Sequence, residues 1–147
     1  MKLDPFVVNR QDYAHPLNVV GVDVTVLASN EKTNSYEVTL QEGAEGTGPM
    51  RHAHPWDESF YVLRGRVDID CNGESIAAEQ GALVHFPAGT PHGYRFGPGG
   101  GAMLEIAGPG GVATKMFAQI AAAKMSGPSD LPRVLPVFEQ SGVTLCR

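Results

Sequence analysis

Residues 51–60 read RHAHPWDESF and place two histidines, a tryptophan and two carboxylates close together in the chain. His52 and His54 are two positions apart, so on a β-strand their side chains lie on the same face. Pro55 interrupts the strand after them, and Glu58 follows. We expect Glu58 to return on the neighbouring strand and to point inward beside the histidines. The stretch therefore predicts three potential metal ligands in one place.

A fourth candidate ligand lies in residues 86–96, which read FPAGTPHGYRF. His92 follows a turn rich in proline and glycine, and it begins a run in which His92, Tyr94 and Phe96 share one face. Three neutral nitrogen donors and one carboxylate suit first-row divalent ions. Four protein ligands on an octahedral ion leave two open positions, which is typical of catalytic metal sites. The predicted cofactor is one divalent transition metal ion, namely Fe, Mn, Ni, Co or Zn.

Alternating apolar and polar residues on either side of these ligands predict half-buried strands. The 18 glycines and 11 prolines of the 147-residue chain, with turn signals such as EGTGP, CNGE and PAGTP, favour a β-sandwich or barrel. The alternating sets are Tyr36, Val38 and Leu40 against Glu37, Thr39 and Gln41, and Val67, Ile69 and Cys71 against Asp68 and Asp70.

A helical pattern replaces this alternation near the end of the chain. Apolar residues follow helical spacing within residues 112–125, and SGP at 126–128 supplies the glycine and proline that close many helices. A second helix is expected from Ser129 or Asp130 to about Gly142, with Pro136 kinking or shortening it. We therefore predict one domain, with an N-terminal arm (1–30), a barrel core (31–110) and a helical C-terminal extension (111–147).

The candidate ligands belong to two spaced motifs. Residues 46–65 read G-x5-H-x-H-x3-E-x6-G, and residues 81–92 read G-x5-P-x-G-x2-H. All nine fixed positions match, and the pair resembles the signature of the cupin superfamily. The resemblance implies an all-β fold, an antiparallel double-stranded β-helix or jelly-roll barrel with a short helical C-terminal appendage. It also places His52, His54, Glu58 and His92 at the family's four metal-ligand positions.

The sequence also predicts a small-molecule pocket beside the metal. Phe96 stands where the second motif usually carries asparagine, which would make the pocket wall more apolar. The C-terminal segment loosely resembles the tail of single-domain cupins that are compared with quercetin dioxygenases. The predicted pocket residues are Met50, Trp56, Phe60, Tyr94 and Phe96.

Three functions are open at this stage. The favoured one is a dioxygenase-like oxidoreductase that acts on a small apolar or aromatic substrate, with Glu58 either staying bound to the metal or acting as the catalytic base. The second is a metal-dependent isomerase or lyase, in which Glu58 or Tyr94 moves a proton. The third is a non-catalytic sensor or storage module that binds a metal or a small ligand.

Composition excludes several other classes. The net charge is −5 and no cluster of basic residues is present, so nucleic acid is not an expected partner. No stretch is long and apolar enough to span a membrane, and the two distant cysteines fit a reducing, cytoplasmic setting. By family resemblance we expect a homodimer. Of the remaining histidines, His85 is expected at the surface or behind a ligand, and His15 is expected to be structural or solvated.

Overall fold

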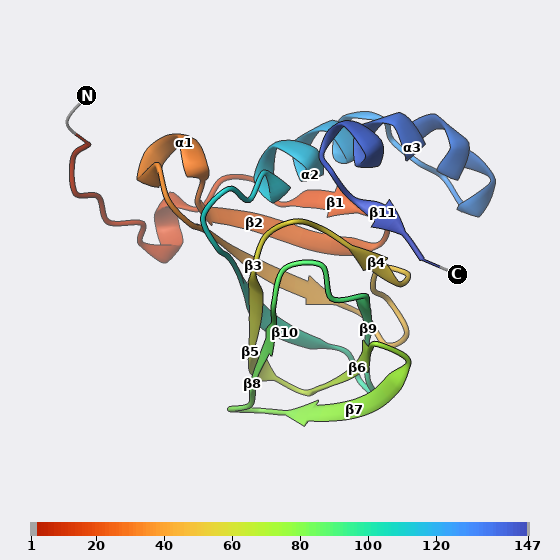
Figure 1. The fold of residues 1–147 in the computed structure, drawn as a ribbon. Helices are drawn as coiled ribbons and strands as arrows, with labels where there is room; N and C mark the ends of the chain where they lie inside the picture. Colours follow the sequence, from red (N-terminus) through yellow and green to blue (C-terminus); the bar gives the residue numbers. More distant parts are fainter. Residues whose placement is uncertain (1–2, 147) are drawn as a thin grey trace.

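The strands form two antiparallel sheets that face each other, as shown in Figure 1 by the computed structural model, which describes residues 3–146. The first sheet has the strand order β1-β2-β3-β10-β5-β8, and the second has the order β11-β4-β9-β6-β7. The predicted jelly-roll fold with C-terminal helices is therefore confirmed. The strands are β1 (Leu17–Val19), β2 (Val22–Ala28), β3 (Glu37–Gly43), β4 (His52–Ala53), β5 (Glu58–Arg64), β6 (Arg66–Cys71), β7 (Glu74–Glu79), β8 (Leu83–Phe86), β9 (His92–Phe96), β10 (Gly101–Ala107) and β11 (Thr144–Leu145).

Glycines fix the corners between these strands. The four glycines of the two motifs all have backbone φ angles in the left-handed region, between 74° and 90°. Such angles are strained for residues with a side chain, so glycine is the natural choice there. At Gly65, between β5 and β6, an added Cβ would also lie only 2.4 Å from the carbonyl oxygen of Gly100.

Two C-terminal helices, α2 (Ala113–Ala122) and α3 (Leu131–Gln140), lie across one end of the barrel beside β1 (Figure 1). Helix α3 runs through Pro136, where a kink or an early end was expected. Pro132 and Pro136 are both exposed, so solvent can bond to the backbone carbonyl that loses its partner. No described helix within residues 3–146 is long and apolar enough to cross a membrane. The shorter helical turns are η1 (Arg10–Asp12), α1 (Asn30–Thr33) and η2 (Pro128–Asp130).

Both ends of the chain contribute strands to the barrel. The predicted arm of residues 1–30 contains β1 and β2, and β2 pairs with β3 in the first sheet. The arm therefore ends earlier than predicted, because Val22 and Val24 are buried in the core. At the other end, β11 pairs with β4 and so joins the second sheet.

Strand β3 keeps the predicted alternation, but its buried face is the polar one. Glu37, Thr39 and Gln41 are at most 3% exposed, whereas Tyr36 is 47% exposed. In the other alternating segment the apolar side chains face inward, as is usual for a half-buried strand: Val67 and Ile69 of β6 are buried in the core. The inner face of the first sheet thus carries polar groups that face the second sheet.

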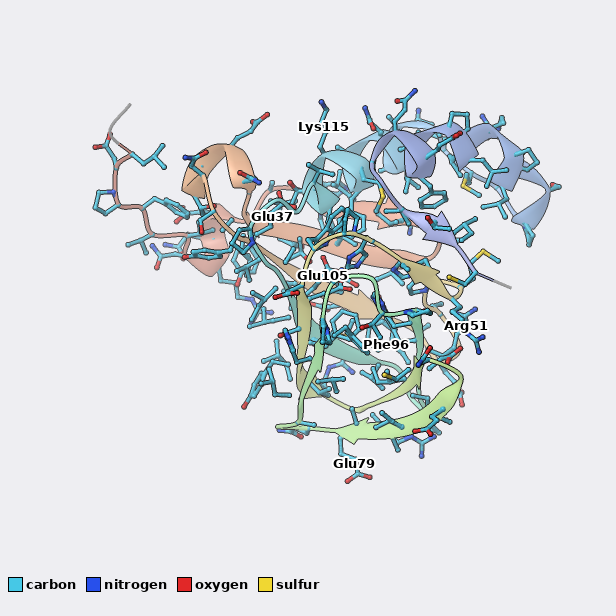
Figure 2. The ribbon with its side chains drawn as sticks, in the orientation of Figure 1. Glu37, Arg51, Glu79, Phe96, Glu105 and Lys115 are labelled. Atoms are coloured by element: carbon cyan, nitrogen blue, oxygen red, sulfur yellow. The ribbon has the colours of Figure 1, made fainter. Side chains whose placement is uncertain are left out.

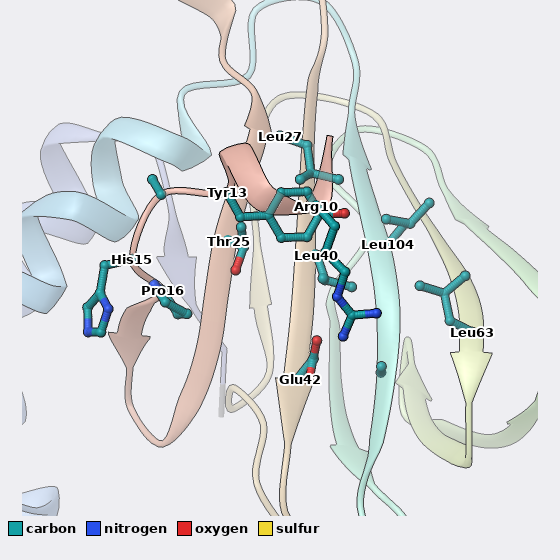
Figure 3. A pocket seen from close by; sticks show the side chains of 12 residues that line it. Arg10, Tyr13, His15, Pro16, Thr25, Leu27, Leu40, Glu42, Leu63 and Leu104 are labelled. Carbon is teal, nitrogen blue, oxygen red and sulfur yellow. The ribbon is translucent and has the colours of Figure 1, made fainter. Parts of the chain in front are cut away.

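The outer face of the first sheet carries a hollow of about 630 Å³ (Figure 3). Leucines from four strands line it, and the N-terminal segment around Arg10 and Tyr13 borders it. His15 also borders this hollow and is exposed, as expected for a solvated residue. The leucines are Leu27 of β2, Leu40 of β3, Leu63 of β5 and Leu104 of β10.

Candidate metal centre

The four predicted metal ligands come together between the two sheets. His52 in β4 lies directly opposite His92 in β9, and His54 follows two residues after His52. Glu58 is the first residue of β5, which pairs with β10 and β8 in the first sheet. The expectation that Glu58 returns on the strand next to the histidines is therefore wrong. The connection at residues 54–57 carries the chain to the opposite sheet, from which Glu58 faces the histidines.

One ligand atom from each of these four side chains lies within 4.8 Å of the other three. His54, Glu58 and His92 are buried, and His52 is half-buried. The ring centres of His52 and His92 are 4.5 Å apart, and those of His54 and His92 are 5.0 Å apart. The side chains of this His₃Glu cluster are thus already gathered to the spacing that a single ion requires.

Backbone carbonyls fix the orientation of all three imidazoles. The Nδ1 atoms of His52, His54 and His92 lie 2.8, 3.0 and 2.8 Å from the carbonyl oxygens of Met50, Trp56 and Thr90, respectively. A carbonyl oxygen can only accept a hydrogen bond, so each Nδ1 carries a proton. The Nε2 atom of each neutral ring is then the one with a free lone pair, as a metal-binding histidine requires.

The contacts of Glu58 show that the centre is built for positive charge. Its Oε2 lies 2.9 Å from Nε2 of His54 and 2.5 Å from Nε2 of His92. A neutral imidazole has one ring proton, and Nδ1 already holds it, so these contacts require either an added proton or a cation among the three groups. A divalent transition metal ion fits this donor set of imidazole nitrogens and one carboxylate.

The pKa values of the cluster follow from burial and from mutual charge. Burial, followed by the charge of His92, lowers the pKa of His52 to about 4. Burial works against the charged form of His92 too, but the hydrogen bond and charge of Glu58 outweigh it and raise the pKa of His92. Burial likewise opposes the ionised form of Glu58, yet hydrogen bonds with His54 and His92 hold its pKa far below the usual range.

A buried polar network lies behind Glu58 on the inner face of the first sheet. The Tyr94 hydroxyl donates to Oε1 of Gln41 (2.5 Å), and Nε2 of Gln41 donates to Oε2 of Glu105 (2.7 Å). Burial and the charge of Glu58 raise the pKa of Glu105 well above its usual value. These effects favour the protonated form of Glu105, which can donate the hydrogen bond that it shares with Glu58. Figure 2 labels Glu105 in the barrel interior.

Sequence reasoning missed Gln41 and Glu105. Gln41 occupies the polar side of an alternating strand, a position that normally faces solvent. Glu105 offered a signal, because it is the only charged residue of the apolar stretch AMLEIA at residues 102–107. A lone carboxylate within such a run is typical of a buried strand that carries a functional group.

A cavity of about 600 Å³ opens from the metal ligands toward the C-terminal helices. Its floor holds the polar network, and its roof is apolar. Four of the five predicted pocket residues line it, namely Met50, Trp56, Phe60 and Tyr94. The roof residues are Met116, Phe117 and Ile120 of α2, Met125 after α2, Leu131 and Phe138 of α3, and Val143 and Leu145 beyond α3.

Phe96 does not line this cavity, in contrast to the prediction. It shares a strand face with Tyr94 but lies two residues further along β9, roughly 7 Å away from the cavity side. Its ring packs edge-on against Tyr94, and a Cβ added at Gly43 would lie 2.7 Å from it. Phe96 is thus a core residue in the deeper part of the barrel, as Figure 2 shows.

A buried carboxylate fastens the roof to the barrel. Glu37 of β3 accepts hydrogen bonds from the backbone N–H of Thr114 in α2 (3.0 Å), from the Thr114 hydroxyl and from the backbone N–H of Asn30 (3.0 Å). The side chain of Asn30 donates in turn to the carbonyl of Gly111 (3.0 Å). Figure 2 shows Glu37 where the sheet meets the start of α2.

Other polar residues in and near the two motifs do not belong to the cluster. His85 is exposed on β8 and contacts the hydroxyl of Ser59 (2.8 Å), so it is a surface residue. Arg51 forms an ion pair with Asp70 (2.8 Å). Arg95 borders the cavity, where its Nη1 donates to the carbonyl oxygens of Gly48 and Pro49.

Comparisons with known proteins agree with this fold and site. Residues 36–104 match the family model of the cupin domain, Cupin_2. A stretch of 73 residues, 48% of the chain, is 34% identical to quercetin 2,3-dioxygenase of Bacillus subtilis (strain 168), and it spans only 22% of that enzyme.

Two solved structures share the fold. KdgF from Halomonas sp. superposes with a TM-score of 0.66 at 17% identity, over 72% of this chain and 94% of KdgF. An RmlC-like cupin from Shewanella frigidimarina NCIMB 400 gives a TM-score of 0.65 at 18% identity, over 74% of this chain and 95% of that protein. The spaced motifs, the jelly-roll fold and the family match together identify the chain as one that carries a cupin domain.

Proposed function

We propose that this protein is a metal-dependent oxidoreductase of the dioxygenase type, which acts on a small, mostly apolar or aromatic molecule. The main support is the His₃Glu cluster at the base of an apolar cavity. The partial similarity to a quercetin dioxygenase supports the choice of reaction. A bound transition metal ion would supply a site that activates an oxygen of the substrate and reacts with dioxygen.

The residues of this chain would prepare the substrate for that chemistry. The apolar roof from α2 and α3 would exclude water from the reacting groups. Glu58 borders the cavity beside the imidazoles and would accept a proton from the substrate at a carboxylate oxygen. The hydrogen bond shared with protonated Glu105 would hold Glu58 in position while it does so.

Oxygen dependence is the direct test of this proposal. Samples of the protein loaded separately with Fe²⁺, Mn²⁺, Ni²⁺, Co²⁺ or Zn²⁺ are incubated with flavonol and catechol substrates, with and without air. We expect oxygen uptake and oxygenated products with at least one redox-active ion, and none from a His52→Ala, His92→Ala variant. Equal turnover with and without air would refute the dioxygenase assignment.

A second candidate is a metal-dependent isomerase or lyase. Gln41 links Tyr94 to Glu105 in a buried hydrogen-bond network, and Glu105 shares a hydrogen bond with Glu58. A network of this kind beside the metal ligands would support proton transfer. Products with the mass of the substrate, formed without oxygen uptake, would support this function. Metal-dependent thermal stabilisation without turnover of any substrate would instead support a non-catalytic binding module.

We also propose that the protein is a homodimer that buries the outer face of its first sheet. The leucine-lined hollow there contains both Arg10 and Glu42 (Figure 3). In a two-fold symmetric contact, Arg10 of one copy can face Glu42 of the other. Light scattering should therefore give twice the chain mass of 15.6 kDa.

A further inference from the structure

Two hairpin turns have nearly the same backbone but different residues. Val20-Gly21 joins β1 to β2 with φ angles of 51° and 88°, and Asn72-Gly73 joins β6 to β7 with φ angles of 53° and 91°. Each turn has two residues with positive φ angles, the form in which Asn-Gly is strongly preferred. The β6–β7 turn follows that preference, whereas the β1–β2 turn has valine in place of asparagine.

The valine is unfavourable for the turn itself. A β-branched residue rarely adopts a positive φ, because its side chain crowds the backbone there. In both turns the glycine N–H donates to a side-chain oxygen three residues earlier, that of Asn18 (3.3 Å) or Asp70 (3.0 Å), so hydrogen bonding does not favour valine in one of them. Packing in the core does not favour it either, because Val20 is 51% exposed. The strain at Val20 therefore points to a role outside the turn.

The two turns differ in their relation to the cavity. Val20 lines the cavity that opens from the metal ligands, and Asn72 does not. Met50 lines the same cavity and is 46% exposed, so these two apolar side chains lie at its mouth, where a ligand can reach them. Arg95 donates to the carbonyl oxygen of Pro49 (2.7 Å) and so holds the segment that carries Met50. The cavity mouth thus has an apolar rim built from two separate segments.

We propose that Val20 determines specificity by contacting the end of the substrate that lies furthest from the metal centre. This inference rests on the proposed function and narrows its substrate class. The substrate has metal-binding oxygens at one end and an uncharged, apolar group at the other. When that group reaches the mouth it covers the exposed side chain of Val20, and burial of this apolar surface favours binding. Asparagine would suit the turn better but would not provide this contact.

Reciprocal substitutions in the two turns test the inference. Catechol, biphenyl-3,4-diol and 3′,4′-dihydroxybiphenyl-4-carboxylate share a metal-binding group, and the last two add an apolar or a charged far end. Calorimetry measures their affinities for the Zn²⁺-loaded wild type, Val20→Asn and Asn72→Val. We expect Val20→Asn to weaken binding of the biphenyl diol about fivefold, as for the loss of part of a buried valine, and to leave catechol binding unchanged. Asn72→Val should change neither affinity, and the wild type should bind the carboxylate more weakly than the biphenyl diol.

Stability gives a second readout that should move in the opposite direction. Val20→Asn should raise the urea midpoint of the Zn²⁺-loaded protein because it relieves the strained turn, and Asn72→Val should lower it. A valine that served only the fold would instead lower the midpoint when replaced, and that result would overturn the inference.

The binding data separate this inference from the proposed function. An unchanged ratio of biphenyl-diol to catechol affinity in Val20→Asn, or tighter binding of the carboxylate by the wild type, would overturn the inference alone. Failure of both catechol and the biphenyl diol to bind the Zn²⁺-loaded wild type would overturn the proposed function, and the inference with it.

Discussion

In the first sheet, strands β3 and β10 carry polar side chains on their inner face and leucines on their outer face. On the inner face, Gln41 of β3 and Glu105 of β10 are buried and hydrogen-bonded. On the outer face, Leu40 and Leu104 of the same strands border a hollow at the surface. Buried polar groups are costly unless they are paired, so an interior of this kind is maintained where function needs it. This difference underlies the two proposals, metal-dependent chemistry at the inner face and self-association through the outer face.

The largest difference between inner and outer positions should be in metal binding. His92→Ala on the inner face removes one ligand, and we expect Zn²⁺ affinity to fall more than about 100-fold, since loss of a supporting residue alone costs 10–100-fold. His85→Ala on the exposed surface of β8 is the matched control and should bind as the wild type does. Competition with a chromophoric chelator measures both affinities. Equal affinities in the two variants would contradict the assignment of His92 as a ligand.

Neighbouring residues on opposite faces of β3 should differ in their effect on stability. Gln41→Leu leaves the Tyr94 hydroxyl and Glu105 without their partner, so it should lower the free energy of unfolding by about 2–3 kcal/mol. Leu40→Gln on the outer face should change it by less than about 1 kcal/mol. Urea unfolding of the two variants measures the difference. A loss below about 1 kcal/mol in Gln41→Leu would show that the buried network does not support the fold.

The outer face should govern self-association. Leu104→Glu places a charge in the proposed interface, so we expect it to raise the dissociation constant of the dimer by about 30-fold, which corresponds to about 2 kcal/mol. Sedimentation velocity at several concentrations measures this constant, and metal content should not change. A wild type that stays a monomer at micromolar concentration would refute the proposed dimer.

The smallest predicted effect is the pH dependence of Zn²⁺ affinity. The raised pKa of His92 means that this ring holds a proton at a higher pH than an ordinary histidine, and the metal must displace that proton. His52, with a pKa of about 4, and ionised Glu58 release none near neutrality. Zn²⁺ affinity should therefore fall as the pH is lowered through the raised pKa of His92, by up to about tenfold per pH unit. Calorimetry in buffers of different ionisation enthalpy should detect proton release that grows as the pH is lowered through this range, whereas no release at any pH would contradict the shift.

Much of the fold was predictable because the motifs fix its corners and ligands. Glycines such as Gly65 mark turns that need a left-handed backbone, and the spacing of His52, His54 and His92 places their rings together. The opposite-sheet position of Glu58 was not predictable, because a short connection can lead to either sheet.

The inward orientation of the polar face of β3 could not be predicted, for a different reason. Hydrophobic alternation shows that a strand has two unlike faces, but it does not show which one faces the interior. The apolar face of a strand usually points to the core, but β3 turns its polar face inward. The partners that satisfy Gln41, Tyr94 and Glu105, lie more than 50 residues away in the sequence, so the strand itself does not reveal them. Phe96 illustrates a further limit, since residues that share a face can lie at different depths of the barrel.

Metal content tests the central claim most directly. The protein is purified without a chelator or a histidine tag, beside its His52→Ala, His92→Ala variant, and both are submitted to elemental analysis. We predict close to one transition metal ion per chain in the wild type and a loss of that metal in the folded variant. Equal metal content in both proteins, or none in either after incubation with divalent ions, would contradict a metal centre at the His₃Glu cluster.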